Sequence, residues 1–164
     1  MLFFKKVCIW SLIVVILYFG SHYYFQLNHE KQVTGAEFLN EQWEIMLPLE
    51  NEELYYRSEF IWKGEGIRYY VLQYNTENLS KLFSQNSFEK ISELNVNSIL
   101  ERLYPHYEGL DIPLTYLPNS KNGEYYYYNK TQSDNDQLHM FLCKNSILNE
   151  SEKENLLFIF EILY

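Results

Sequence analysis

The chain has 164 residues, of which 47% are hydrophobic and 18% aromatic, and its formal charge is −9. This length fits one domain, and the apolar content excludes global disorder. The acidic balance argues against nucleic-acid binding, because phosphate recognition needs clustered lysine and arginine. A partner that is steered by charge is therefore expected to be basic.

The apolar run near the N-terminus predicts a membrane anchor that the protein keeps. Residues 7–25 would form about 28 Å of helix, close to the thickness of the hydrocarbon core. No pair of small residues at the spacing of a signal-peptidase site follows the run directly. Lys5 and Lys6 precede it, which predicts a cytoplasmic N-terminus and an extracellular C-terminal domain. We expect residues 1–25 to be a cytoplasmic tip and single transmembrane signal-anchor helix, 26–33 a stem and 34–164 an extracytoplasmic domain.

The first elements expected in this domain are a helix and a hairpin. Thr34 and Glu37 have the spacing of a capping box, and apolar residues then recur at helical spacing until Pro48. Residues 54–62 alternate as a strand does. The turn KGEG follows, and residues 67–74 return as the second strand.

The middle of the chain is expected to be helical in pieces and then to form a long loop. In residues 76–104, Ser98 and Glu101 have the spacing of a second capping box, and Phe88, Ile91 and Leu94 are expected to share one helix face. Pro105 closes this region. Residues 105–123 contain three prolines and two glycines without a clear period. Long loops of this kind inside a compact domain are often functional.

The last third of the chain predicts a three-strand meander. Residues 124–130 include four consecutive tyrosines, and residues 137–143 return across a polar turn. Residues 156–163 are apolar on both faces except for Glu161, as is typical of an interior strand. We predict an α+β fold with one antiparallel sheet, made of the hairpin and the meander and covered on one side by short helices.

Motifs for chemistry are absent from the sequence. It contains no nucleophile elbow, zinc motif, Walker loop or dinucleotide fingerprint. No catalytic residue, metal ligand or cofactor-binding residue is therefore predicted, and no cofactor. His139 is expected to be a half-buried sheet residue and Cys143 a small buried hydrophobic residue.

The loop after Pro105 is the predicted partner-binding site. Three prolines limit its motion, which reduces the entropy lost on binding, and tyrosine offers a large contact area with a polar tip. Its carboxylates would favour a basic partner. The predicted partner-binding residues are Tyr104, His106, Tyr107, Glu108, Asp111 and Tyr116.

Three functions are compatible with these patterns. The first is a non-catalytic interaction or accessory module of the cell envelope that binds a basic protein or an envelope component. The second is an immunity or inhibitor protein that binds a basic partner. The third is an envelope hydrolase in which His106, Glu108 and Asp111 share a metal ion or act as acid and base. Because catalytic motifs are missing, binding is favoured over catalysis.

The loop tyrosines have a competing interpretation. The sixteen tyrosines of the chain are typical of an AT-rich genome, so those in the loop would then only cover the end of the sheet.

Overall fold

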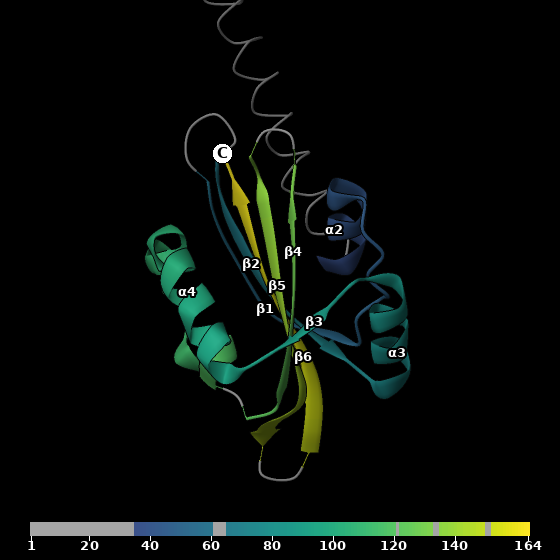
Figure 1. Ribbon diagram of the computed structural model, residues 1–164. Helices are drawn as coiled ribbons and strands as arrows, with labels where there is room; N and C mark the ends of the chain where they lie inside the picture. Colours follow the sequence, from purple (N-terminus) through teal and green to yellow (C-terminus); the bar gives the residue numbers. More distant parts are fainter. Residues whose placement is uncertain (1–34, 61–64, 121, 133–134, 150–151) are drawn as a thin grey trace, which may run out of the picture. The chain divides into compact units, whose positions relative to one another are not determined.

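Six antiparallel strands form one sheet in the order β1-β2-β6-β5-β4-β3 (Figure 1). The computed structural model describes residues 35–60, 65–120, 122–132, 135–149 and 152–164. The strands are β1 (Glu52–Phe60), β2 (Gly66–Tyr74), β3 (Glu89–Ile91), β4 (Glu124–Thr131), β5 (Gln137–Asn149) and β6 (Glu152–Leu163). The helices are α2 (Gly35–Trp43), α3 (Thr76–Gln85) and α4 (Glu93–Tyr107), followed by the 3-10 turns η1 (Glu108–Leu110), η2 (Leu114–Tyr116) and η3 (Pro118–Ser120).

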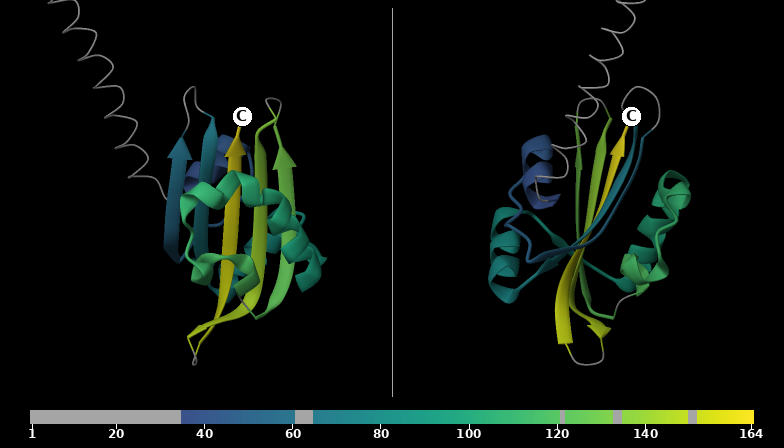
Figure 2. Two further views of the ribbon diagram at one scale, coloured as in Figure 1. Left: turned by 90° about the vertical axis from the view of Figure 1, so that its left-hand side faces the viewer. Right: turned by 180° about the vertical axis from the view of Figure 1, so that it is seen from behind.

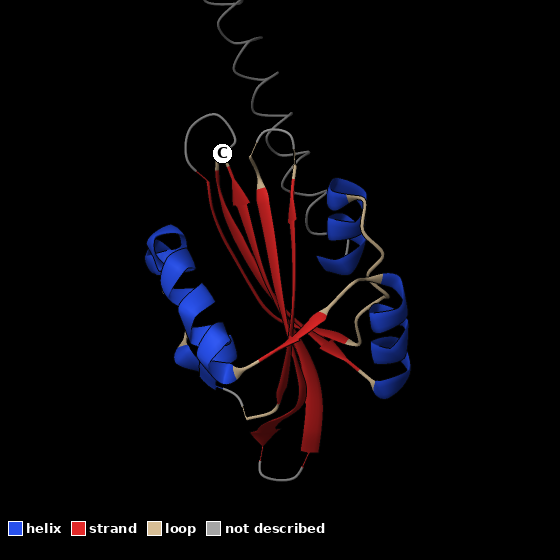
Figure 3. Ribbon diagram, in the orientation of Figure 1, coloured by secondary structure: helices blue, strands red, loops and turns tan. Residues whose placement is uncertain are grey.

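Helices cover both faces of the sheet. α4 lies on one face, whereas α2 and α3 lie on the other (Figures 2 and 3). The predicted α+β class and antiparallel sheet are confirmed, but the expected cover on one side only is wrong. The physical reason lies in β2 and β6, whose described side chains are buried on both faces over most of their length. Strands of this kind need an apolar layer on each side.

The predicted hairpin and meander are both present. β1 pairs with β2, β4 pairs with β5, and β5 pairs with β6. β6 also pairs with β2, which places it in the interior of the sheet as predicted. The short strand β3 was not predicted, because three residues are too few to show a period.

Helix boundaries differ from the prediction around residue 92. The Ser92 side chain caps α4 and accepts a hydrogen bond from the Asn95 amide, so α4 begins well before the predicted cap at Ser98. The expected helix face through Phe88 and Ile91 is wrong, since Ile91 belongs to β3. α4 also continues past Pro105 to Tyr107. A proline in the last turn removes one helical hydrogen bond at a point where the helix ends anyway. Thr34 lies outside the described residues.

The core under α2 and α3 contains a buried ion pair. Glu161 is completely buried on β6, and its Oε2 lies 3.0 Å from Arg68 Nη1 on β2. The Trp43 indole N–H donates to Glu161 Oε1 at 2.7 Å. The Arg68 guanidinium lies over the rings of Phe38 and Phe60, 4.7 and 4.8 Å from their centroids. Burial raises the pKa of the Glu161 carboxyl, and the Arg68 charge and the indole N–H oppose that rise.

None of the helices in the described part of the chain is both long enough and apolar enough to cross a membrane. The predicted span, residues 7–25, lies outside the described residues.

Candidate functional site

α4 directs its apolar side chains to the sheet and its polar side chains to solvent. Val96, Ile99, Leu100 and Leu103 are buried and pack with residues of β2, β5 and β6. They recur at the three- and four-residue spacing of one helix face. The polar residues between them therefore lie where α4 meets solvent.

An open groove of about 400 Å³ lies beside α4. Five of its lining residues belong to α4, and the sixth belongs to η3, which contacts α4. The lining provides two phenol rings, two side-chain amides, one carboxylate and one aliphatic side chain. These residues are Asn97, Leu100, Glu101, Tyr104, Tyr107 and Asn119.

Two tyrosines form the aromatic wall of the groove. The rings of Tyr104 and Tyr107 meet edge to face with centroids 5.6 Å apart. Tyr107 is buried against Phe160, whereas Tyr104 is 53% exposed. Burial raises the pKa of the Tyr107 phenol, and Tyr104 adds to the rise. The Tyr107 hydroxyl is therefore neutral and held in place by the core, whereas the Tyr104 ring is accessible to a ligand.

The structure brings two of the six predicted partner-binding residues into this groove, Tyr104 and Tyr107. His106 is exposed and its ring lies 6.0 Å from that of Tyr164, outside the groove lining. Glu108 is exposed at the start of η1, and Asp111 is exposed just after it with a left-handed backbone, φ 49°. Neither carboxylate lines the groove.

Tyr116 has a structural position. Its ring stacks on Tyr55 with centroids 4.7 Å apart, and its carbonyl oxygen accepts a hydrogen bond from the Tyr69 hydroxyl. The next turn is fastened in the same way, since the Tyr125 hydroxyl donates to the Pro118 carbonyl at 2.8 Å. Tyr55, Tyr69 and Tyr125 thus hold residues 116–118 against the sheet.

A shared metal ion has no ligand set in the described part of the chain. No three His, Cys, Asp or Glu side chains there lie close enough to bind one ion. His106, Glu108 and Asp111 therefore do not form a metal site in this arrangement.

A second polar cluster lies on the sheet, at β4 and β5. The Tyr127 hydroxyl and His139 Nδ1 are 2.6 Å apart, and His139 Nε2 is 3.1 Å from Gln137 Oε1. Desolvation, with Arg102 and His106 in addition, lowers the pKa of His139 to about 4. The neutral ring accepts from Tyr127 and donates to Gln137. His139 is half-buried and Cys143 buried, as predicted.

The groove residues Asn97, Glu101 and Asn119 were missed by the sequence analysis. Asn97, Glu101 and Tyr104 are spaced by four and three residues, which places them on one helix face. That pattern is visible only when the helix is started at Ser92 rather than Ser98. Asn119 carries no such signal, because it reaches the groove from a turn with no periodicity.

The fold and the site together define an antiparallel α+β domain with an open groove of mixed aromatic and polar character. No protein-family model, curated protein or solved structure matches the chain.

Proposed function

We propose that the chain is a single-pass membrane-anchored protein whose acidic extracytoplasmic domain is a non-catalytic interaction module of the cell envelope. We further propose that the groove beside α4 binds a basic segment of a partner protein. The observation that carries the second proposal is the groove itself, with a carboxylate and two tyrosines on one rigid helix.

The chemistry of the lining fits a cationic side chain. Glu101 supplies a negative charge, and the exposed ring of Tyr104 supplies a face for a cation–π contact. The side-chain oxygens of Asn97 and Asn119 can accept further hydrogen bonds from a guanidinium or an ammonium group. The net charge of −9 would attract a basic partner from a distance.

The rigidity of the groove favours binding. Leu100 and Tyr107 are buried, so two of the lining residues are fixed by the core before a ligand arrives. A site on a packed helix loses less conformational entropy on binding than a site on an open loop.

The groove is tested with the full-length chain in detergent and a fluorescent peptide of alternating arginine and glycine. The double variant Glu101→Gln with Tyr104→Ala should weaken binding about tenfold, which corresponds to about 1.4 kcal/mol. Fluorescence anisotropy measures the affinity for the peptide. This affinity should fall as the salt concentration is raised, because the chain and the peptide have opposite charge.

The matched control is Glu108→Gln with Tyr164→Ala. It removes the same charge and a tyrosine of similar exposure, 51% against 53%, both outside the groove lining. Equal affinity of both double variants for the peptide would contradict the groove as the binding site.

The membrane topology is tested separately with a C-terminal tag on intact cells. The lysines before residues 7–25 lead us to expect that added protease removes the tag. A tag that stays protected, or a mature N-terminus within residues 20–37, would contradict the anchored topology.

A further inference from the structure

The segment between α2 and β1 displays two large apolar side chains on the face opposite the groove. Residues 45–49 form this segment, the 45–49 loop. Ile45 and Leu47 are buried in the core with α2 and α3, whereas Met46 is 64% and Leu49 56% exposed. Exposed apolar side chains scattered singly need no explanation, but here two lie within four residues of each other on one loop.

Two asparagine side chains fix the backbone at the start of this loop. Asn40 makes two hydrogen bonds with the backbone of Leu47. Its Nδ2 donates to the Leu47 carbonyl at 2.7 Å, and its Oδ1 accepts from the Leu47 amide at 2.6 Å. Asn86, at the end of α3, donates from Nδ2 to the Met46 carbonyl at 2.8 Å. The loop is therefore tied to both helices of this face.

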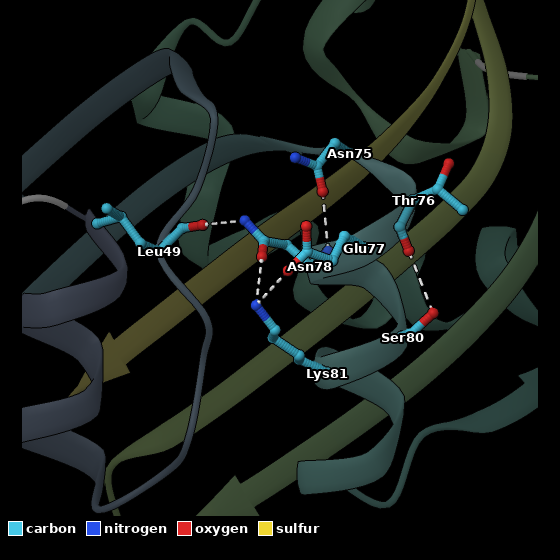
Figure 4. Close-up of polar contacts among 7 residues, drawn as sticks. All are labelled: Leu49, Asn75, Thr76, Glu77, Asn78, Ser80 and Lys81. Carbon is cyan, nitrogen blue, oxygen red and sulfur yellow. Dashed lines mark hydrogen bonds and ion pairs between the residues drawn. The ribbon is translucent and has the colours of Figure 1, made fainter.

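A third asparagine fixes the end of the loop. Asn78 Nδ2 donates to the Leu49 carbonyl at 2.9 Å (Figure 4). Asn78 is itself held in the first turn of α3, because its amide is capped by Asn75 Oδ1 and its Oδ1 lies 3.4 Å from Lys81 Nζ. Figure 4 shows the Asn78 side chain between the loop and Lys81. Met46 and Leu49 are thus presented on a backbone held at three carbonyls.

These hydrogen bonds reduce the entropy that the loop backbone loses when a partner binds. The ordering entropy of the backbone is lost when the chain folds, so association loses less of it. Pro48, between Leu47 and Leu49, restricts φ as well.

The charge around the loop identifies the kind of partner. Residues 41–53 contain five glutamates and no lysine or arginine. Glu41, Glu44, Glu52 and Glu53 are exposed. Desolvation raises the pKa of the Glu53 carboxyl, and the nearby Glu50 adds to the rise. An anionic lipid surface and a second copy of this chain would both be repelled by these carboxylates.

We propose that the 45–49 loop is a docking surface for a segment of a protein partner in which apolar and basic side chains alternate. Met46 and Leu49 pack against the apolar side chains of that segment, and the flanking glutamates pair with its basic residues. Asn40, Asn78 and Asn86 are positioning residues that hold the loop. This surface is separate from the groove and does not depend on the function proposed for it.

The test uses the full-length chain and a fluorescent peptide of alternating leucine and lysine. Met46→Ser with Leu49→Ser should weaken binding at least tenfold in fluorescence anisotropy, because both apolar contacts are lost. The matched control is Leu94→Ser with Leu114→Ser, which removes two apolar side chains that are 80% and 76% exposed on the α4 side. The control should leave the affinity unchanged, and so should the groove variant Glu101→Gln with Tyr104→Ala.

A second variant examines the loop backbone without touching the apolar contacts. Asn78→Ala should weaken the peptide several-fold, whereas Asn129→Ala, on the exposed part of β4, should not. Three results would overturn the proposal: equal binding by the wild type and the Met46/Leu49 variant, loop-dependent binding to phosphatidylcholine vesicles in place of the peptide, or loop-dependent dimers in sedimentation.

Discussion

The two faces of the sheet bury polar groups in different ways. On the α4 face the core is rich in aromatic rings, among them Tyr69, Phe141 and Phe160. Its tyrosine hydroxyls reach backbone carbonyls at the edge of the core, as Tyr69 does at Tyr116. On the α2 and α3 face the core contains the ion pair between Arg68 on β2 and Glu161 on the interior strand β6. Both faces are held by packing, and the α2 and α3 face also contains a buried pair of opposite charges.

The same strand serves both faces. Leu156, Phe158, Phe160 and Ile162 belong to the α4-side core, whereas Leu157 and Ile159 belong to the other core. This is the two-residue alternation of a strand buried on both sides. A substitution on β6 therefore tests one face at a time, and its cost should depend on how that face is built.

The largest effect is expected from Phe160→Ala on the α4 face. Phe160 is completely buried and its ring contacts those of Tyr69, Tyr107 and Phe141 at 4.5, 5.1 and 5.9 Å. Truncation leaves a cavity among these rings and should cost about 3 to 5 kcal/mol in the free energy of unfolding. Urea denaturation followed by circular dichroism measures the loss. A cost below about 1 kcal/mol would mean that this core closes over the cavity and is not held by packing.

Arg68→Met tests the charged face. It leaves the Glu161 carboxylate buried without its countercharge, which should cost about 3 kcal/mol. Adding Glu161→Gln should recover part of this loss, since the neutral amide can still accept from the Trp43 indole. The same denaturation assay compares both variants. A double variant that is less stable than Arg68→Met alone would show that the pair acts through shape and not through charge.

His139 makes the stability dependent on pH. Its pKa is about 4 in the folded chain and about 6.5 in an unfolded one, so the unfolded state binds the proton first. Stability from the neutral ring is complete above pH 6.5 and is lost as pH falls towards 4. We expect a loss of about 2 kcal/mol between pH 7 and pH 5, before most carboxylates titrate.

The control for this pH dependence is His139→Gln, measured by denaturation at the same pH values. The variant should lose less stability than the wild type over this interval. An NMR titration that finds the His139 pKa near 6.5 would contradict the buried neutral ring and its contact with Tyr127.

Much of the fold was predictable because its signals are local. Alternation between Leu54 and Phe60 and between Ile67 and Tyr74 predicted the hairpin, and the apolar run from Leu156 predicted an interior strand. The cover on the second face was not predicted. The apolar character of Leu72, Tyr74 and Leu157 on that face became informative only once β2 and β6 were known to be neighbours.

The candidate sites were less predictable because they depend on contacts distant in sequence. Tyr104 and Tyr107 were predicted as aromatic residues of the proline-bounded loop, but Asn119 joins them only through the packing of η3 against α4. The link between Asn86 and the Met46 carbonyl spans forty residues. No period in the sequence reports such a bond. Helical spacing was expected to continue through Met46 until Pro48, but α2 ends at Trp43 and the 45–49 loop is not helical.

The smallest effect is expected from Lys130→Met at the edge of the α2 side. Lys130 Nζ, on β4, donates to the carbonyls of Trp43 and Glu44, where α2 ends. A cation at this end of a helix satisfies free carbonyls and interacts favourably with the helix dipole. Methionine keeps the apolar stem but removes the donor, so we expect a cost of about 1 kcal/mol in the free energy of unfolding.

Lys81→Met is the control for this prediction. It breaks an ion pair with Glu77 in which both side chains are more than half exposed, and it should leave the melting temperature unchanged. If both variants melt like the wild type, the end of α2 is held by Trp43 and the core beneath it, and the contact from β4 adds nothing to the stability of that face.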